Sequence, residues 1–115
     1  MRIAVCDDDQ AIREELIQLI QKQVSDVDIV RYQPGEEMIS AKGNFDIYFL
    51  DIEMGSVSGM DLARRIREQE EGVRQRSIII FVTGYREYME AAFDVNAFHY
   101  LVKPIDEGKF SEVFS

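Results

Sequence analysis

The sequence has 115 residues but only one cysteine, one histidine, two prolines and no tryptophan. Because Cys6 is the only cysteine, it cannot form an internal disulfide, and Cys6 with His99 cannot supply the ligand set of a zinc site. No run of about eighteen apolar residues occurs, and the chain turns acidic at Asp7 before a signal-peptide core could develop. We therefore expect no membrane span, no secretory leader and a reducing, cytoplasmic location.

Basic residues are also scarce, because 22 acidic side chains oppose 13 basic ones and set the formal net charge at −9. Nucleic-acid-binding modules usually carry a basic footprint, and Arg64, Arg65 and Arg67 form only a short one. We expect these arginines to lie on the solvated face of a helix, and we expect this domain to make no direct contact with nucleic acid. The length corresponds to one domain, residues 1–115.

Five short apolar runs alternate with segments of helical periodicity. The runs are Ile3–Cys6, Asp28–Tyr32, Ile47–Leu50, Ile78–Val82 and Phe98–Val102. Most of them are rich in valine, isoleucine and aromatic residues, which favours strands, and Ile78–Val82 lacks the polar alternation of a strand with one wet face. The alternation predicts an α/β fold: a flavodoxin-like, doubly wound parallel sheet of five strands in the order 2-1-3-4-5.

Helices are expected between the strands. After Asp9, which is placed to cap a helix, Ile12, Leu16, Leu19 and Ile20 fall on one helical face. The other predicted helices are one from a Ser58-x-x-Asp61 capping box to near Gly72, one over Arg86–Phe93 and a short one over Glu36–Ala41.

The last segment has Phe110, Val113 and Phe114 at helical spacing but stops after roughly two turns, less than the mean helix length. We therefore expect the final helix to be truncated and the natural protein to continue.

Polar side chains suited to phosphate or metal chemistry follow four of the five apolar runs. Asp7 and Asp8 follow the first run, Asp51 the third, Thr83 the fourth and Lys103 the fifth. Open parallel sheets bind ligands at the carboxyl ends of their strands, near the point where the strand order reverses. Because parallel strands share one direction, we expect these side chains to lie together at one edge of the sheet.

An acidic cluster at that edge needs a counter-charge. Two carboxylates about 4 Å apart repel by roughly 4 kcal/mol at an effective dielectric constant of about 20, so Asp7 or Asp8 facing Asp51 requires a cation or a shared proton. Oxygen ligands of this kind favour a partly hydrated Mg²⁺, which keeps positions open for a phosphoryl oxygen. With Lys103 as a point charge and Thr83 as a hydroxyl donor, the pattern indicates a phosphoryl-transfer site.

Several residues have simpler interpretations. Asp9 alone is best explained as a helix cap, and Cys6, inside an apolar run, as a small buried group rather than a nucleophile. His99 has no partner that would give it a catalytic role.

Four motifs together give the chain a family resemblance. They are A-V-C-D-D-D, F-L-D-I-E-M-G-S-V-S-G, I-I-I-F-V-T-G and F-H-Y-L-V-K-P-I-D. Over its whole length the chain resembles the CheY-like receiver domain of two-component response regulators, especially the kind that precedes a LytTR-type DNA-binding output domain. That output domain is absent from residues 1–115.

The resemblance implies a role for each strand-end residue. Asp51 would be the phosphoacceptor, Thr83 and Lys103 would take the hydroxyl and lysine positions, and Tyr100 would be the aromatic switch residue. The implied ligands of Mg²⁺ are Asp8 and Asp51 directly, Asp7 mainly through water, and the backbone carbonyl of Glu53.

The resemblance also points to residues that tune the lifetime of the phosphorylated form. Glu53 and Tyr85 would border the path of the hydrolytic water, with Glu53 able to orient it and Tyr85 able to shield the phosphoryl group; we expect shielding to prevail. Two positions depart from the family pattern. Gly55 replaces the usual proline, which loosens the loop after the acceptor, and Gly84 stands where alanine or serine is commoner.

The implied function is phosphotransfer signalling. A sensor histidine kinase would donate the phosphoryl group to Asp51. Thr83 and then Tyr100 would reorient. The face made by the fourth helix, fifth strand and fifth helix would then change its dimerisation and so the activity of a DNA-binding output domain. The domain would be a signalling module that catalyses only its own phosphorylation and dephosphorylation.

Two alternatives compete with this interpretation. Asp7-x-Asp9 imitates the D-x-D motif of haloacid-dehalogenase-type phosphohydrolases, but Ala11 stands where that family prefers threonine or valine, and the chain lacks a cap and a longer core. A receiver-like scaffold that does not accept phosphate is the other alternative, and it is weakened because every key position is filled.

Overall fold

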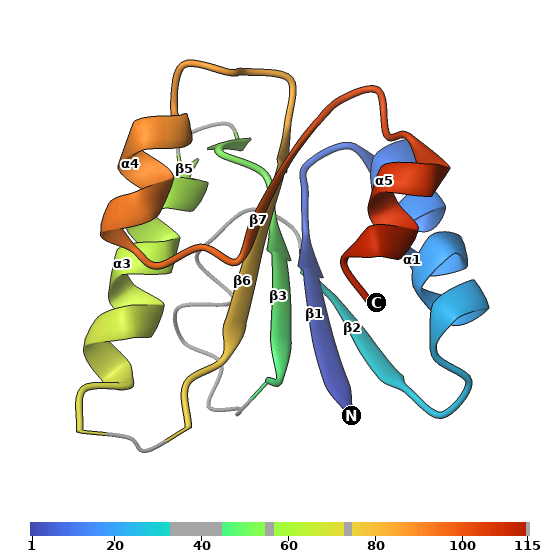
Figure 1. The fold of residues 1–115 in the computed structure, drawn as a ribbon, viewed down its shortest axis with the longest axis horizontal. Coiled ribbons are helices and arrows are strands. Elements are labelled where there is room, and N and C mark those ends of the chain that lie inside the picture. Colours follow the sequence, from blue (N-terminus) through green and yellow to red (C-terminus); the bar gives the residue numbers. More distant parts are fainter. Residues whose placement is uncertain (33–44, 55–56, 73–74, 115) are drawn as a thin grey trace.

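The computed structural model describes residues 1–32, 45–54, 57–72 and 75–114. Its centre is a five-stranded parallel sheet in the order β2-β1-β3-β6-β7 (Figure 1). The strands are β1 (Arg2–Cys6), β2 (Asp28–Tyr32), β3 (Ile47–Leu50), β6 (Ile78–Thr83) and β7 (His99–Val102). The predicted class, direction and order of the strands are confirmed. The sequence did not predict the small antiparallel pair β4 (Glu53–Met54) and β5 (Val57–Ser58), which follows β3.

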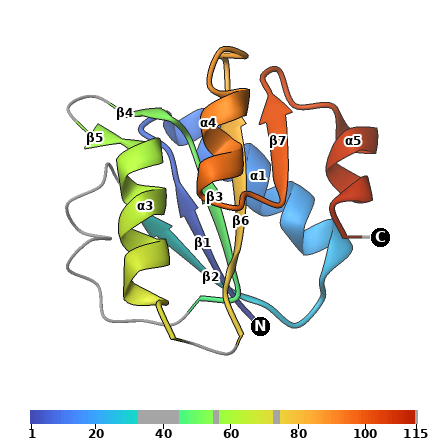
Figure 2. The ribbon, with the colours of Figure 1, turned by 60° about the vertical axis from the view of Figure 1, so that its left-hand side comes forward.

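Helices cover both faces of this sheet. On one face lie α1 (Gln10–Gln23) and α5 (Glu107–Glu112), and on the other lie α3 (Gly59–Gln69) and α4 (Met89–Asp94), as the two ribbon views show (Figure 2). None of the helices among the described residues has the length and apolar character needed to cross a lipid bilayer. The predicted helix over Glu36–Ala41 lies outside the described residues, as does Gly55.

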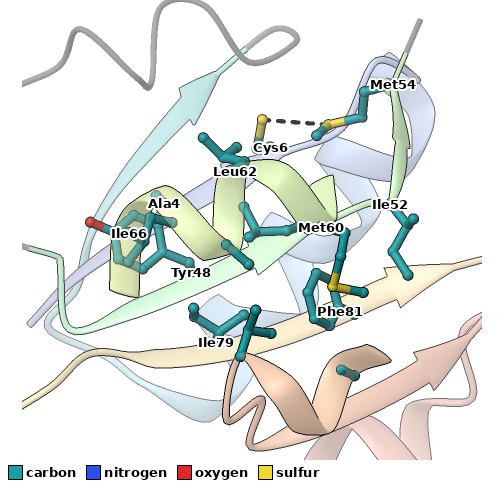
Figure 3. Close-up of a cluster of buried hydrophobic side chains, with 14 of the residues drawn as sticks. Ala4, Cys6, Tyr48, Ile52, Met54, Met60, Leu62, Ile66, Ile79 and Phe81 are labelled. Atoms are coloured by element: carbon teal, nitrogen blue, oxygen red, sulfur yellow. Dashed lines mark hydrogen bonds between the residues drawn. The ribbon is translucent and has the colours of Figure 1, made fainter. Parts of the chain in front are cut away.

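Alternate residues of each strand feed two separate hydrophobic layers. Ile3 and Val5 face the layer with α1 and α5, whereas Ala4 and Cys6 face the layer with α3 and α4. Figure 3 shows the second layer, in which the thiol of Cys6 donates a hydrogen bond to the sulfur of Met54 at 3.5 Å. Cys6 is 1% exposed, so its expected role as a small buried group is confirmed.

Both helix caps predicted from the sequence are confirmed. The carboxylate of Asp9 accepts hydrogen bonds from the backbone N–H groups of residues 11 and 12, and the hydroxyl of Ser58 accepts from that of Met60. Helix α4, however, begins at Met89 rather than Arg86. In the turn before it, the backbone carbonyl of Tyr85 accepts the Tyr100 hydroxyl, and the Tyr88 hydroxyl donates to Glu53.

One of the three helix arginines departs from its expected place in solvent. Arg64 makes an exposed ion pair with Asp61, but the side chain of Arg67 is only 13% exposed. Its guanidinium donates to Glu70 at 2.9 Å and to three backbone carbonyls, those of Val95 at 2.7 Å, Ser77 at 2.8 Å and Asn96 at 3.0 Å. Arg67 thus joins α3 to the residues that follow α4, because the carbonyls left open at a helix end attract a charged donor.

Candidate functional site

The carboxyl ends of four strands bring the predicted polar side chains to one edge of the sheet, the upper edge in Figure 1. Asp7 and Asp8 follow β1, Asp51 follows β3, and Lys103 follows β7, while Thr83 is the last residue of β6. The strands stop there because acidic and small polar residues replace the apolar run. The expectation that these side chains lie on one edge of the sheet is therefore confirmed, whereas their chemical roles stay predictions.

Lys103 links the two buried carboxylates. Its Nζ lies 2.9 Å from Oδ2 of Asp7 and 3.0 Å from Oδ2 of Asp51, whose side chains are 1% and 7% exposed. Burial raises the pKa of Asp7 above its usual value. Burial alone would favour a neutral amine at Lys103, but hydrogen bonds to Asp7 and Asp51 outweigh it and raise the pKa of Lys103. One firmly charged ammonium therefore serves two carboxylates.

The acidic cluster has an oxygen that no donor satisfies. Asp7, Asp8 and Asp51 each offer a carboxylate oxygen within 4.8 Å of the other two, with Asp8 exposed and the other two buried. Oδ1 of Asp7 accepts the backbone N–H of Asp9 at 2.9 Å. Oδ1 of Asp51 is buried and, among the described residues, has no hydrogen-bond partner. A buried carboxylate oxygen without a donor is costly, so this atom is suited to a cation or an electrophile.

The backbone around Asp51 is held by a close approach of Gly59. The N–H of Asp51 donates to the carbonyl of Cys6 at 3.0 Å, and the N–H of Gly59 donates to the carbonyl of Ile52 at 2.6 Å. A Cβ atom added to Gly59 would lie 1.8 Å from the carbonyl oxygen of Asp51. Only glycine fits here, a requirement that the motif contained but that spacing alone did not explain.

Thr83 and Tyr100 both make contact with the segment that follows β6. The Thr83 hydroxyl oxygen is fully buried and accepts the N–H of Tyr85 at 3.4 Å. The Tyr100 hydroxyl donates to the backbone carbonyl of Tyr85, and its ring lies 6.1 Å from that of Phe81. Burial raises the pKa of Tyr100. Residues 83 and 100 are thus connected through the backbone of residue 85.

A second tyrosine, which sequence reasoning missed, contacts Glu53. The hydroxyl of Tyr88 donates to Oε1 of Glu53 at 3.1 Å, and the ring of Tyr85 packs edge-on against that of Tyr88 at 6.2 Å. Hydrogen bonding to Glu53 raises the pKa of both tyrosines. The available sequence signal was the pair of tyrosines three residues apart directly after Thr83 and Gly84.

The family model for the response regulator receiver domain matches residues 3–115. The chain belongs to this family. The receiver is 32% identical over 112 residues to the sensory transduction protein LytT of Oceanobacillus iheyensis, a match that covers 96% of this chain and 45% of the relative. It is 34% identical over 118 residues to the transcriptional regulatory protein BtsR of Escherichia coli, covering 100% of this chain and 47% of BtsR. The receiver thus spans about half the length of the relatives it matches.

Solved structures agree with this assignment. The receiver superposes with a TM-score of 0.88 on the response regulatory domain of protein mrkE from Klebsiella pneumoniae, at 26% identity and with 99% of this chain and 92% of that chain covered. With the response regulator protein TrrA from Thermotoga maritima in complex with Mg²⁺-BeF, the TM-score is 0.80 at 32% identity, covering 96% of this chain and 93% of that chain. The predicted family and its CheY-like fold are confirmed.

Proposed function

We propose that this receiver accepts a phosphoryl group on Asp51. The observation that carries the proposal is Oδ1 of Asp51, a buried carboxylate oxygen to which no described residue donates, on a side chain whose other oxygen is held by Lys103 at 3.0 Å. A nucleophile needs one fixed orientation and one free lone pair, and this carboxylate has both.

The residues present fit a Mg²⁺ ion. Asp8 and Asp51 would ligate it directly, Asp7 mainly through water, and the backbone carbonyl of Glu53 would complete the protein ligands. TrrA, which resembles this chain, was crystallised with Mg²⁺-BeF. When bound, the ion would neutralise negative charge on the transferring phosphoryl oxygens.

The phosphoryl transfer would proceed in line from a phosphohistidine of a sensor histidine kinase. A bond forms between the Asp51 carboxylate oxygen and phosphorus as the bond from phosphorus to the donor imidazole nitrogen breaks, and the nitrogen keeps the electron pair. Lys103 already lies within 3.0 Å of the acceptor carboxylate and would contact one phosphoryl oxygen. Thr83 would turn its hydroxyl from the N–H of Tyr85 toward another oxygen, and Tyr100 would follow.

The readout face would be that of α4, β7 and α5. Met89 is 41%, Phe93 80% and Phe98 57% exposed, and these apolar side chains line one shallow pocket with Tyr100. Exposed aromatic residues next to the switch position suit a homodimer contact that responds to phosphorylation. The relatives named LytT and BtsR are described as sensory transduction and transcriptional regulatory proteins, so the output outside this domain would bind DNA while the receiver itself does not.

The test is intact mass after treatment with acetyl phosphate and Mg²⁺. We expect the parent chain to gain one phosphoryl group that hydroxylamine removes, as it removes an acyl phosphate. Asp51→Asn should gain none, and Asp61→Asn, which changes an exposed aspartate on α3, should behave like the parent. A label on Ser56 or Ser58, or no label on the parent, would refute the proposal and in the second case favour the receiver-like scaffold.

The phosphohydrolase alternative has no support from the family match, which assigns residues 3–115 to the receiver family. We propose that the domain turns over no substrate other than its own phosphoryl group. Release of phosphate from a generic phosphomonoester, at a rate that depends on Asp7 or Asp9, would contradict this.

A further inference from the structure

We propose that Tyr88 is a positioning residue that prolongs the phosphorylated state by holding the carboxylate of Glu53 away from the hydrolytic water. This inference rests on the proposed phosphorylation of Asp51. It concerns a residue outside the acceptor, metal and switch positions, and it depends on a contact that only the folded chain reveals.

The first observation is that Tyr88 is itself well anchored. Its ring is half-buried and packs against the hydrophobic layer between the sheet and helices α3 and α4. Its backbone immediately precedes α4, and its hydroxyl reaches across to β4. A tyrosine with a packed ring has few rotamers to lose, so its hydroxyl is a donor with a nearly fixed position.

The second observation is that Glu53 is an exposed side chain whose carboxylate accepts a hydrogen bond from Tyr88. Glu53 is exposed, it lies two residues after the proposed acceptor, and Tyr88 donates to its Oε1 at 3.1 Å. An exposed glutamate ordinarily samples many rotamers. The hydrogen bond therefore selects one direction for a carboxylate that could otherwise turn toward Asp51.

The third step concerns the chemistry that a free Glu53 carboxylate would perform. In hydrolysis of the aspartyl phosphate, the oxygen of water bonds to phosphorus while the bond from phosphorus to the Asp51 oxygen breaks, and the carboxylate leaves with the electron pair. The water also loses a proton, which a nearby carboxylate can accept as a general base. A Glu53 carboxylate that accepts a hydrogen bond from Tyr88 is held by that hydroxyl and is not free to turn toward the water.

The neighbouring tyrosine reinforces the arrangement. The ring of Tyr85 is edge-on to that of Tyr88 at 6.2 Å, and hydrogen bonding to Glu53 raises the pKa of both hydroxyls. Two aromatic side chains thus flank one carboxylate. Tyr88→Phe removes the hydrogen bond at 3.1 Å and leaves both rings in place, so the role of the Tyr88 hydroxyl is separable from shielding by the ring of Tyr85.

The experiment is a double-mutant cycle on the decay of the phosphorylated chain, measured by intact mass after removal of acetyl phosphate. Tyr88→Phe retains the ring and removes the hydroxyl, and we expect its phosphoryl group to be lost about 3- to 10-fold faster, the range set by one hydrogen bond. In the Glu53→Ala background the same change should leave the decay rate unaltered. Tyr48→Phe, which removes a hydroxyl from a buried tyrosine on β3, should decay at the parent rate.

The outcomes distinguish a failure of this inference from a failure of the proposed phosphorylation of Asp51. A parent chain that gains no phosphoryl group overturns both. A labelled parent with Tyr88→Phe decaying at the parent rate overturns only the role of Tyr88, as does equal acceleration with and without Glu53. The melting temperature of each variant shows whether a faster decay comes from loss of folded protein. If Tyr88→Phe is destabilised, the inference is still supported when Tyr88→Phe accelerates decay in the parent and does not accelerate it in the Glu53→Ala background.

Discussion

Replacing Lys103 with methionine isolates the electrostatics of the site, because methionine preserves an unbranched apolar stem and removes the ammonium. In the parent, Nζ lies 2.9 Å from Asp7 and 3.0 Å from Asp51. In the variant, two carboxylates that are 1% and 7% exposed face each other with no cation. Removing one partner of a buried ion pair costs about 3 to 5 kcal/mol, and the 21% exposure of the Lys103 side chain places this case near the lower figure.

The same reasoning predicts how the stability cost of Lys103→Met depends on Asp51 and on Mg²⁺. In an Asp51→Asn background only Asp7 loses its counter-charge and no second carboxylate repels it, so Lys103→Met should cost less, about 1.5 kcal/mol, the lower figure for a hydrogen bond to a charged group. Saturating Mg²⁺ should restore more stability to Lys103→Met than it adds to the parent, because the cation binds a more negative native site.

Urea unfolding of the parent, Lys103→Met, Asp51→Asn and the double variant, each with EDTA and with Mg²⁺, measures these costs. The midpoint and slope of each curve give the free energy of unfolding. Leu101→Met, on β7 two residues before Lys103, is the control for introducing a methionine beside the site. A Lys103→Met cost below about 1 kcal/mol in EDTA would refute the argument, because it would mean that the carboxylates do not repel at this separation. An equal cost of Lys103→Met in the parent and in the Asp51→Asn background would also refute the argument.

Three further predictions follow from the same edge of the sheet. Gly59→Ala should destabilise the fold by about 3 kcal/mol or more in urea titrations, whereas Gly84→Ala, where an added Cβ meets nothing within 4 Å, should stay within about 1 kcal/mol of the parent; equal costs would contradict the role of Gly59. Millimolar Mg²⁺ should raise the melting temperature, and an Asp8→Asn, Asp51→Asn double variant should lose that rise unless the cation binds elsewhere. Tyr85→Ala should lose its phosphoryl group faster than the parent, because a ring that is 41% exposed no longer shields the site; a parent-like decay would place control of the lifetime elsewhere.

Sequence patterns predicted the sheet and the convergence of its polar ends for a simple physical reason. A strand covered on both faces must be apolar throughout, so a run such as Ile78–Val82 is visible directly, and the first polar residue after it marks the strand end. Parallel strands then bring those ends together regardless of how far apart they lie in the chain. Asp7 and Lys103, separated by 96 positions, meet for this reason.

Contacts that depend on loop geometry were not predictable in the same way. The hydrogen bond from Tyr88 to Glu53 forms in the turn directly before α4, which begins at Met89, whereas helical periodicity suggested an earlier start. The close approach of Gly59 to Asp51 depends on the turn that carries β4 and β5. Backbone carbonyls have no signature in the sequence, so the partners of Arg67 could not be distinguished from solvent.

Side-chain contacts hold the two ends of α4 with unequal strength. At the far end, the guanidinium of Arg67 bonds the carbonyls of Val95 and Asn96 and is itself held by Glu70, a set of charge-assisted contacts in a largely buried setting. At the near end, the side chain of Tyr88 contributes a single hydrogen bond to an exposed glutamate. A rearrangement of small free-energy cost should therefore move the Tyr88 end of α4, together with Glu53, more easily than the Arg67 end. We therefore expect phosphorylation of Asp51 to pivot α4 about its Arg67 end, which would tilt the exposed apolar side chains of Met89 and Phe93.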